Sequence, residues 1–211
     1  MGQICHKLHH LLGDLPLFGF PFDTDKIPRN GIYILFEKGE YAHGTNRIVR
    51  IGTHTGENQL RSRLLQHFVR ENKDRSIFRK NIGRALLNKA RDSYSPIWEL
   101  DLTTHEAKKK YSALIDAQKQ KKTERQATTY MQGSFRFVVF QVDGKDQRLA
   151  LESKIISTVS SCHECKPSSE WLGNFSPKDK IRASGLWQVN ELYRQPLTEE
   201  DYVNLERELG R

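Results

Sequence analysis

The sequence predicts an α+β domain built on a small antiparallel sheet. Two runs rich in β-branched and aromatic residues, GIYILF at 31–36 and RIVRIG at 47–52, are separated by a polar stretch, which is typical of a hairpin with a long turn. A third run, SFRFVVFQVD at 134–143, alternates as a strand does. Helical patterns lie between the second and third runs and also follow the third. The predicted order is therefore hairpin, helices, strand and helix.

The segments around the hairpin have distinct characters. Residues 15–29 are rich in Pro, Gly and Phe, which predicts an irregular lead-in held by aromatic side chains. After the hairpin, Leu60, Leu64 and Phe68 recur at helical spacing. They predict a helix over 58–70, for which Asn58 is a candidate N-cap.

The middle of the chain predicts a second helix and then a basic segment. The second helix spans 76–90 and is stopped by the Ser-Pro pair at 95–96, after which IWELDL at 97–102 suggests a strand. Residues 104–126 form a helical pattern with seven Lys or Arg against three acidic residues. A solvated helix face and a helix that contacts phosphates are both consistent with this charge.

The helix predicted over 148–159 carries a carboxylate where an apolar residue is expected. Its apolar residues fill an arc of roughly 140°, and Glu152 falls inside that arc. Burying an ionised carboxylate without a partner costs several kcal/mol. Glu152 should therefore form an ion pair with a Lys or Arg, be protonated, or bind a metal ion.

The last part of the chain holds a cysteine pair and a terminal helix. Cys162 and Cys165 form one C-x-x-C, and Cys5 with His9 or His10 could supply a second ligand pair for zinc. Incidental thiols are the default interpretation, and a zinc-stabilised interaction domain is the alternative. TEEDYVNLEREL at 198–209 then predicts a helix that begins at a capping threonine.

Composition limits the class of protein. A chain of 211 residues, 36% hydrophobic and 28% charged, can bury one good core. It contains no apolar stretch of about 18 residues and no secretory leader pattern, so we expect a cytoplasmic protein without a membrane span. Three cysteines form no disulfide framework and suit a reducing compartment. The net charge of +8 and the pI near 9.4 favour a polyanionic partner.

The hairpin and the helix after it bring reactive side chains together. If Gly31 pairs with Gly52, Tyr33 lies opposite Arg50, and the guanidinium favours the phenolate form of the tyrosine. An ordinary cross-strand pair is the alternative. On the helix, Arg63 and His67 are four residues apart at the edge of the apolar stripe, where they lean over the sheet.

This set of side chains suits phosphodiester hydrolysis with one divalent metal ion. Glu152 would bind Mg²⁺ or Mn²⁺, which neutralises developing charge on the phosphate. Arg63 would stabilise the crowded phosphate electrostatically. Tyr33 would take a proton from the attacking water, aided by His67 or Arg50.

The same residues resemble the motifs of the GIY-YIG endonuclease superfamily over about 27–177. GIY occurs at 31–33, RIG at 50–52 and NQLRSRLLQH at 58–67, followed by Glu152 and by Asn174 in WLGN. The resemblance implies a three-stranded antiparallel sheet flanked by helices and a metal-dependent endonuclease that acts on DNA. It also implies roles for individual residues: a catalytic tyrosine at Tyr33, arginine at Arg63, histidine at His67, metal-binding glutamate at Glu152 and loop asparagine at Asn174.

One position departs from the family pattern. Arg50 stands where the family has its second tyrosine, so a basic residue has taken over the role of that tyrosine or the role is lost. Some restriction-type members resemble this chain in placing a basic residue there, which favours activity. The alternative is a catalytically inactive nucleic-acid-binding module on the same fold. His54 in GTHTG is more consistent with a turn residue than with a catalytic helper.

The resemblance also suggests how the chain is divided. Residues 1–29 form the lead-in, 30–177 the nuclease-like domain with a basic insertion at about 100–133, and 178–211 a C-terminal extension. The sequence leaves open whether the protein acts as a monomer or a homodimer. The basic residues expected to contact DNA are Arg79, Lys80, Lys108, Lys109 and Lys110.

Overall fold

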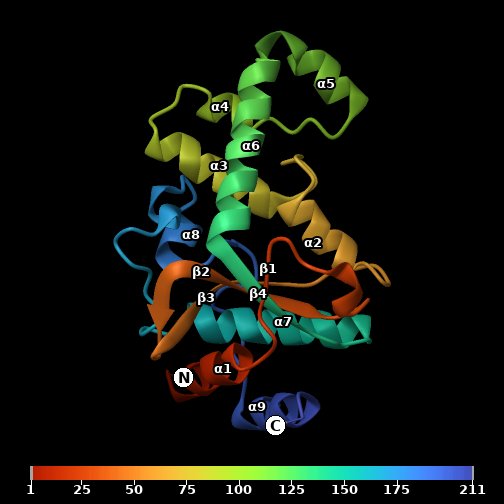
Figure 1. The fold of residues 1–211 in the computed structure, drawn as a ribbon. Helices are drawn as coiled ribbons and strands as arrows, with labels where there is room; N and C mark the ends of the chain where they lie inside the picture. Colours follow the sequence, from red (N-terminus) through yellow and green to blue (C-terminus); the bar gives the residue numbers. More distant parts are fainter. Residues whose placement is uncertain (1, 211) are drawn as a thin grey trace.

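A computed structural model describes residues 2–210, in which a four-stranded antiparallel sheet has helices on both faces (Figure 1). This confirms the predicted α+β class. Across the sheet the strands are β1 (Phe18–Gly19), β4 (Phe135–Phe140), β2 (Ile32–Ala42) and β3 (Thr45–Gly52). The prediction of three strands missed β1, because a two-residue strand has no sequence period.

The helices follow most of the predicted patterns but add one at the start of the chain. The α-helices are α1 (Gly2–Gly13), α2 (Leu60–Phe68), α3 (Ile77–Lys89), α4 (Ser95–Trp98), α5 (His105–Tyr111), α6 (Ala117–Ser134), α7 (Lys145–Ser160), α8 (Asp179–Ser184) and α9 (Glu199–Glu208). Short 3-10 helices span Thr24–Lys26, Ser112–Leu114 and Leu172–Phe175. Within residues 2–210, none of the helices combines the length and apolar character needed to cross a bilayer.

Alternating strand residues supply two cores, one on each face of the sheet. Ile32 and Ile34 pack in a core with residues of α1, α7 and α9, which lie on one side of the sheet in Figure 1. Tyr33 and Leu35 point the other way and pack with residues of α2, α3 and α6. Both ends of the chain therefore contribute to the core under the sheet.

The hairpin is longer and its register differs from the predicted one. Its polar segment is part of the strands, and a two-residue turn at His43–Gly44 closes the hairpin between Ala42 and Thr45. Two irregularities in β2 then shift the pairing, so that Tyr33 lies opposite Gly52 instead of Arg50. The predicted register was wrong because bulges leave no signature in the alternation of residues.

Three local predictions are corrected by the structure. Residues 97–102 form no strand, since Pro96 lies in the first turn of α4 instead of ending a helix. Asn58 does not cap α2, because it has a left-handed backbone with φ of 56° and Gln59 occupies the cap position. The basic segment is two helices instead of one, because α6 begins anew after its N-cap, Asp116.

Candidate active site

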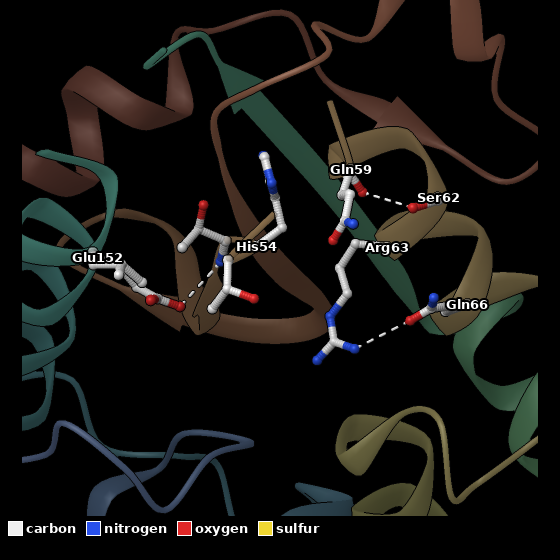
Figure 2. Close-up of a pocket in the computed structure, with 9 residues that line it drawn as sticks. His54, Gln59, Ser62, Arg63, Gln66 and Glu152 are labelled. Atoms are coloured by element: carbon white, nitrogen blue, oxygen red, sulfur yellow. Dashed lines mark hydrogen bonds between the residues drawn. The ribbon is translucent and has the colours of Figure 1, made fainter. Parts of the chain in front are cut away.

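A cleft opens between the loop after β3, helix α2 and helix α7. One part, of about 270 Å³, is lined by Thr53, His54, Thr55, Gln59, Ser62, Arg63, Gln66, Leu149 and Glu152 (Figure 2). An adjoining part of about 570 Å³ shares Thr55, Arg63, Leu149 and Glu152 with the first and also includes Arg50, Asn81 and Asn190. Three of the predicted catalytic residues, Arg50, Arg63 and Glu152, therefore line one continuous cleft.

Glu152 extends from α7 towards the loop that follows β3. Its Oε1 accepts a hydrogen bond of 3.0 Å from the backbone N–H of Thr53, and Figure 2 shows this contact. Among residues 2–210, no Lys or Arg forms an ion pair with Glu152, and Oε2 accepts no hydrogen bond. Burial raises the pKa of the carboxyl group, while Arg50 and the Thr53 N–H oppose this rise. The structural ion pair considered for Glu152 is therefore not formed.

Tyr33 lies beneath the cleft at the start of a buried hydrogen-bonded chain. Its Oη is 2.9 Å from His67 Nε2, and His67 Nδ1 is 2.7 Å from the hydroxyl of Ser76. Ser76 is also the N-cap of α3, where its Oγ accepts from the Arg79 N–H. All four residues are fully buried. Ser76 was not predicted to belong to the site, although its position as a helix cap was visible in the sequence.

His67 is neutral in this environment. Burial lowers its pKa well below the ordinary value, and the positive charges of Arg63, Arg50 and Arg79 lower it further. Arg50 donates from Nε to Tyr33 Oη at 3.4 Å, which leaves the phenol hydrogen free to point at His67 Nε2. In that tautomer His67 Nδ1–H donates to Ser76. The neutral Nε2 of His67 can therefore accept the hydrogen bond of the phenol and hold its orientation.

Arg50 reaches Tyr33 diagonally across the hairpin instead of from the opposite position. Its Nη1 donates to the Trp187 carbonyl at 2.6 Å, and its guanidinium lies 4.9 Å from the centre of the Phe78 ring. Gly52 leaves the room for this arrangement, because a Cβ at residue 52 would lie 2.2 Å from Tyr33 Oη. The glycine of the RIG motif is thus required by the position of the tyrosine.

Arg63 extends from α2 into both parts of the cleft. Its Nη1 donates to Gln66 Oε1 at 3.2 Å and to the Arg75 carbonyl at 3.3 Å. It forms no ion pair with an acidic side chain within the described part of the chain. Figure 2 shows Arg63 and Glu152 on opposite sides of the open space. A guanidinium without an acidic partner at the edge of an open space is suited to binding a phosphate group.

Asn174 does not belong to this cleft. It lies in the 3-10 helix Leu172–Phe175, and its amide group donates to the carbonyls of Ser168 and Ser169. Asn174 therefore does not line the cleft with the other predicted catalytic residues, and its amide holds its own loop. Asn190, which lies between α8 and α9, does line the cleft. No local pattern in the sequence distinguishes the two asparagines.

His54 contributes an unpaired ring nitrogen to the wall of the cleft. Its Nδ1 contacts the Gly56 carbonyl at 2.6 Å, as expected for a turn residue, but Nε2 is buried without a hydrogen-bond partner. Burial lowers the pKa of His54, and the nearby Arg148 adds to this effect. The side chain is therefore a neutral acceptor beside the space between Glu152 and Arg63.

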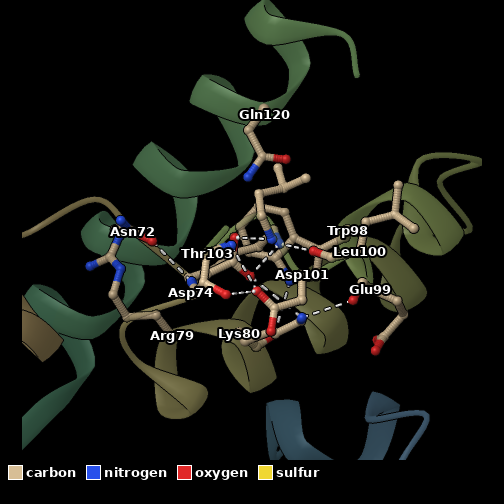
Figure 3. Close-up of polar contacts among 12 residues, drawn as sticks. Asn72, Asp74, Arg79, Lys80, Trp98, Glu99, Leu100, Asp101, Thr103 and Gln120 are labelled. Atoms are coloured by element: carbon tan, nitrogen blue, oxygen red, sulfur yellow. Dashed lines mark hydrogen bonds and ion pairs between the residues drawn. The ribbon is translucent and has the colours of Figure 1, made fainter. Parts of the chain in front are cut away.

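Two of the basic residues predicted to contact DNA are held inside the protein, and Figure 3 shows the contact of one of them, Lys80, with Glu99. Arg79 is fully buried and forms an ion pair of 2.9 Å with Glu124. Lys80 is 8% exposed and donates to the Glu99 carbonyl. These two predictions are corrected, because neither side chain offers its charge to a ligand. The lysines at 108–110 are exposed on α5 and stay predicted contacts.

The donors in the cleft fit a hard divalent cation. Mg²⁺ binds through one or two carboxylates and retains several waters. Glu152 offers a carboxylate oxygen with no other partner beside an open space of about 270 Å³. A site of this kind holds the ion together with an oxygen of the substrate.

Comparison with known proteins gives a single finding at the level of a family. A sequence model described as a GIY-YIG domain matches residues 2–206, which is nearly the whole chain and includes every residue of the cleft. No match was found among curated proteins or among solved structures.

Proposed function

The chain belongs to the GIY-YIG family of nuclease domains, and from this premise we propose that it is a metal-dependent endonuclease that hydrolyses phosphodiester bonds in DNA. The observation that carries the proposal is the position of Tyr33 Oη, which contacts both His67 Nε2 and Arg50 Nε. Arg50 continues from there into the cleft that holds Glu152 and Arg63. These contacts support a site in which Tyr33 is the proton acceptor, Arg50 and Arg63 are the cations and Glu152 is the carboxylate that binds the metal ion.

In the proposed reaction Tyr33 acts as the general base. His67 orients the phenol through a hydrogen bond, Ser76 fixes the imidazole, and Arg50 stabilises the phenolate that forms when Oη loses its proton to water. The phenolate then takes the proton of the attacking water. Because Tyr33 is fully buried, Arg50 has to turn towards the phosphate and uncover Oη when DNA enters.

Arg63 and Glu152 act on the phosphate group. Arg63 places its charge against the phosphate oxygens, where negative charge increases in the transition state. Glu152 would hold Mg²⁺ or Mn²⁺. Such an ion, when bound, neutralises charge on the phosphate and on the leaving oxygen.

The proposed substrate is DNA because the chain is strongly basic and its exposed lysines lie outside the cleft. Lys108, Lys109 and Lys110 lie on α5, which projects from the body of the protein in Figure 1. We propose that this arm, part of the insertion at 100–133, contacts the DNA backbone away from the cleaved bond. The division into a domain at 30–177 with flanking segments, and the cytoplasmic location, are part of the same proposal.

The test is cleavage of plasmid and branched DNA in Mg²⁺ or Mn²⁺. Glu152→Gln keeps the shape of the side chain and removes its charge, and we expect it to lower the cleavage rate by about 100-fold or more. Asp146→Asn is the matched control, because Asp146 is exposed on the same helix. Parental cleavage by Glu152→Gln, or no cleavage by the parent on any substrate, would contradict the proposal.

The second candidate is a nucleic-acid-binding module without activity. The full burial of Tyr33 favours it. An inactive module should bind DNA in a salt-sensitive way without cleaving it, and Glu152→Gln should leave this binding unchanged. Measuring binding and cleavage on the same DNA separates the two candidates.

A further inference from the structure

A second cluster of reactive side chains lies on the opposite side of the sheet from Tyr33. It joins three segments that are distant in sequence: Cys5 on α1, His43 in the β2–β3 turn, and the Cys162–Cys165 pair just after α7. The three thiols are 0–5% exposed, and the His43 side chain is fully buried. Along the α7 axis, the ten residues from Glu152 to Cys162 correspond to about 15 Å, so this cluster is separate from the cleft.

The distances within this cluster resemble those around a metal ion. Cys165 Sγ lies 3.4 Å from Cys5 Sγ and 3.2 Å from His43 Nε2, and Cys162 Sγ lies 3.5 Å from the same nitrogen. In a tetrahedral zinc centre with ordinary Zn–S and Zn–N bonds, neighbouring ligand atoms are roughly 3.5–3.8 Å apart. The ligand atoms of Cys5, His43 and Cys165 lie within 4.8 Å of one another, so these side chains need only small movements to enclose one zinc ion with Cys162. We infer that Cys5, His43, Cys162 and Cys165 form a structural zinc site.

His43 is oriented as a zinc ligand is. Its Nε2 faces the two thiols, while Nδ1 lies 3.3 Å from a carboxylate oxygen of Glu164, although the angle is not that of a hydrogen bond. A carboxylate behind the second ring nitrogen is the usual support for a zinc-binding histidine. His43 also has a left-handed backbone with φ of 53°, a conformation that residues other than glycine rarely adopt. The turn thus places an imidazole where the thiols converge.

His9 approaches two of the thiols, with Nδ1 3.6 Å from Cys5 Sγ and Nε2 3.8 Å from Cys165 Sγ, but His9 and His10 also have backbone partners. His9 Nδ1 lies 2.9 Å from the Cys5 carbonyl, and its Nε2 accepts the Ile48 N–H at 3.2 Å. His10 Nε2 contacts the His43 carbonyl at 3.0 Å. Since both nitrogens of His9 are used, Cys162 is the fourth ligand and His9 positions the Cys5 segment. This gives the Cys₃His donor set that is common in structural zinc sites.

Zinc at this site would fasten α1 to the hairpin and to the end of α7. The thiols must lose their protons to bind the ion, so affinity rises with pH and a chelator acts against folding. The inference does not depend on the proposed nuclease activity. Glu152→Gln should leave the zinc content unchanged.

The first experiment measures zinc in the full chain, purified under reducing conditions without a chelator. We expect about one zinc per chain in the parent, a large loss of zinc in Cys162→Ser, and a lower melting temperature after chelation. His163→Gln is the matched control, because His163 is exposed within the same loop and should keep the metal. Metal-free protein that takes up no Zn²⁺ after thiol reduction would overturn the inference, as would a Cys5–Cys165 disulfide in the native protein.

The second experiment works even where a serine variant fails to fold. X-ray absorption at the zinc edge of the parent should give three sulfur ligands and one nitrogen. Two sulfurs and two nitrogens would overturn the assignment of Cys162 and favour His9. Co²⁺ bound to the parent chain should show the intense visible absorption of a tetrahedral thiolate site, and weak octahedral absorption would also count against the inference.

Discussion

Gly52→Ala tests the position of Tyr33 more directly than removal of the tyrosine does. An added Cβ would lie 2.2 Å from Oη and 2.3 Å from Cζ of Tyr33, whereas ordinary contact begins at 3.4 Å. One of the two groups must therefore move by roughly 1 Å, in a core where overpacking costs about 1–3 kcal/mol. For a chain of this length, that lowers the melting temperature by roughly 2–4 °C per kcal/mol. Moving Oη by this distance should also lower the cleavage rate by about 100-fold.

The same substitution at another glycine provides the control. Gly133 lies in α6, and an added Cβ would meet no atom within 4 Å. Gly133→Ala should therefore stabilise the protein by up to about 1 kcal/mol, because alanine is the better helix former. Chemical denaturation and a cleavage assay on both variants give the comparison. If Gly52→Ala unfolds at the same denaturant concentration as the parent and cleaves DNA as fast, the deduced packing of Tyr33 against residue 52 is incorrect.

Two further predictions concern charge. The pKa of His67 is lowered in the folded state, so below its unfolded value of about 6.5 the unfolded chain binds the additional proton. The free energy of unfolding should therefore fall as the pH drops from 7.5 to 5.5. His67→Gln should reduce the dependence of this free energy on pH by up to about 1.4 kcal/mol per pH unit. If denaturant titrations give both proteins the same pH dependence, the lowered pKa of His67 is refuted. Replacing Lys108, Lys109 and Lys110 by alanine should lower the salt dependence of DNA binding by about 0.9 per lost phosphate contact and leave melting unchanged. An unaltered salt slope would exclude α5 from the DNA contact.

Local signals in the sequence were enough for most of the elements. The helix around Glu152, the strand at 135–140 and the terminal helix after Thr198 all follow from residue spacing and capping. The capping box between Thr198 and Asp201 needs only four residues of sequence to be recognised. Elements of this kind can be predicted because the interactions that define them lie within one or two turns.

Contacts between distant segments were not predictable in the same way. Arg79 is buried because Glu124, which lies 45 residues later, pairs with it. His43 joins the thiol cluster only because bulges and a tight turn set the end of the hairpin. Asn174 and Asn190 differ in role because one amide is used by its own loop and the other borders the cleft. In each case the residue type was visible, but its partner depended on tertiary packing.

The contacts of Arg50 explain how the site accommodates a basic residue where the family has a tyrosine. Its Nε donates to Tyr33, and among the charged groups near Glu152 it opposes the rise in the glutamate pKa most strongly. One guanidinium therefore donates a hydrogen bond to Tyr33 and favours the ionised form of Glu152. A tyrosine at this position could donate a hydrogen bond to one of them but would carry no charge to share between the two. Arginine at residue 50 thus contacts Tyr33 and also places a positive charge near Glu152. This is why we favour an active nuclease over an inactive module.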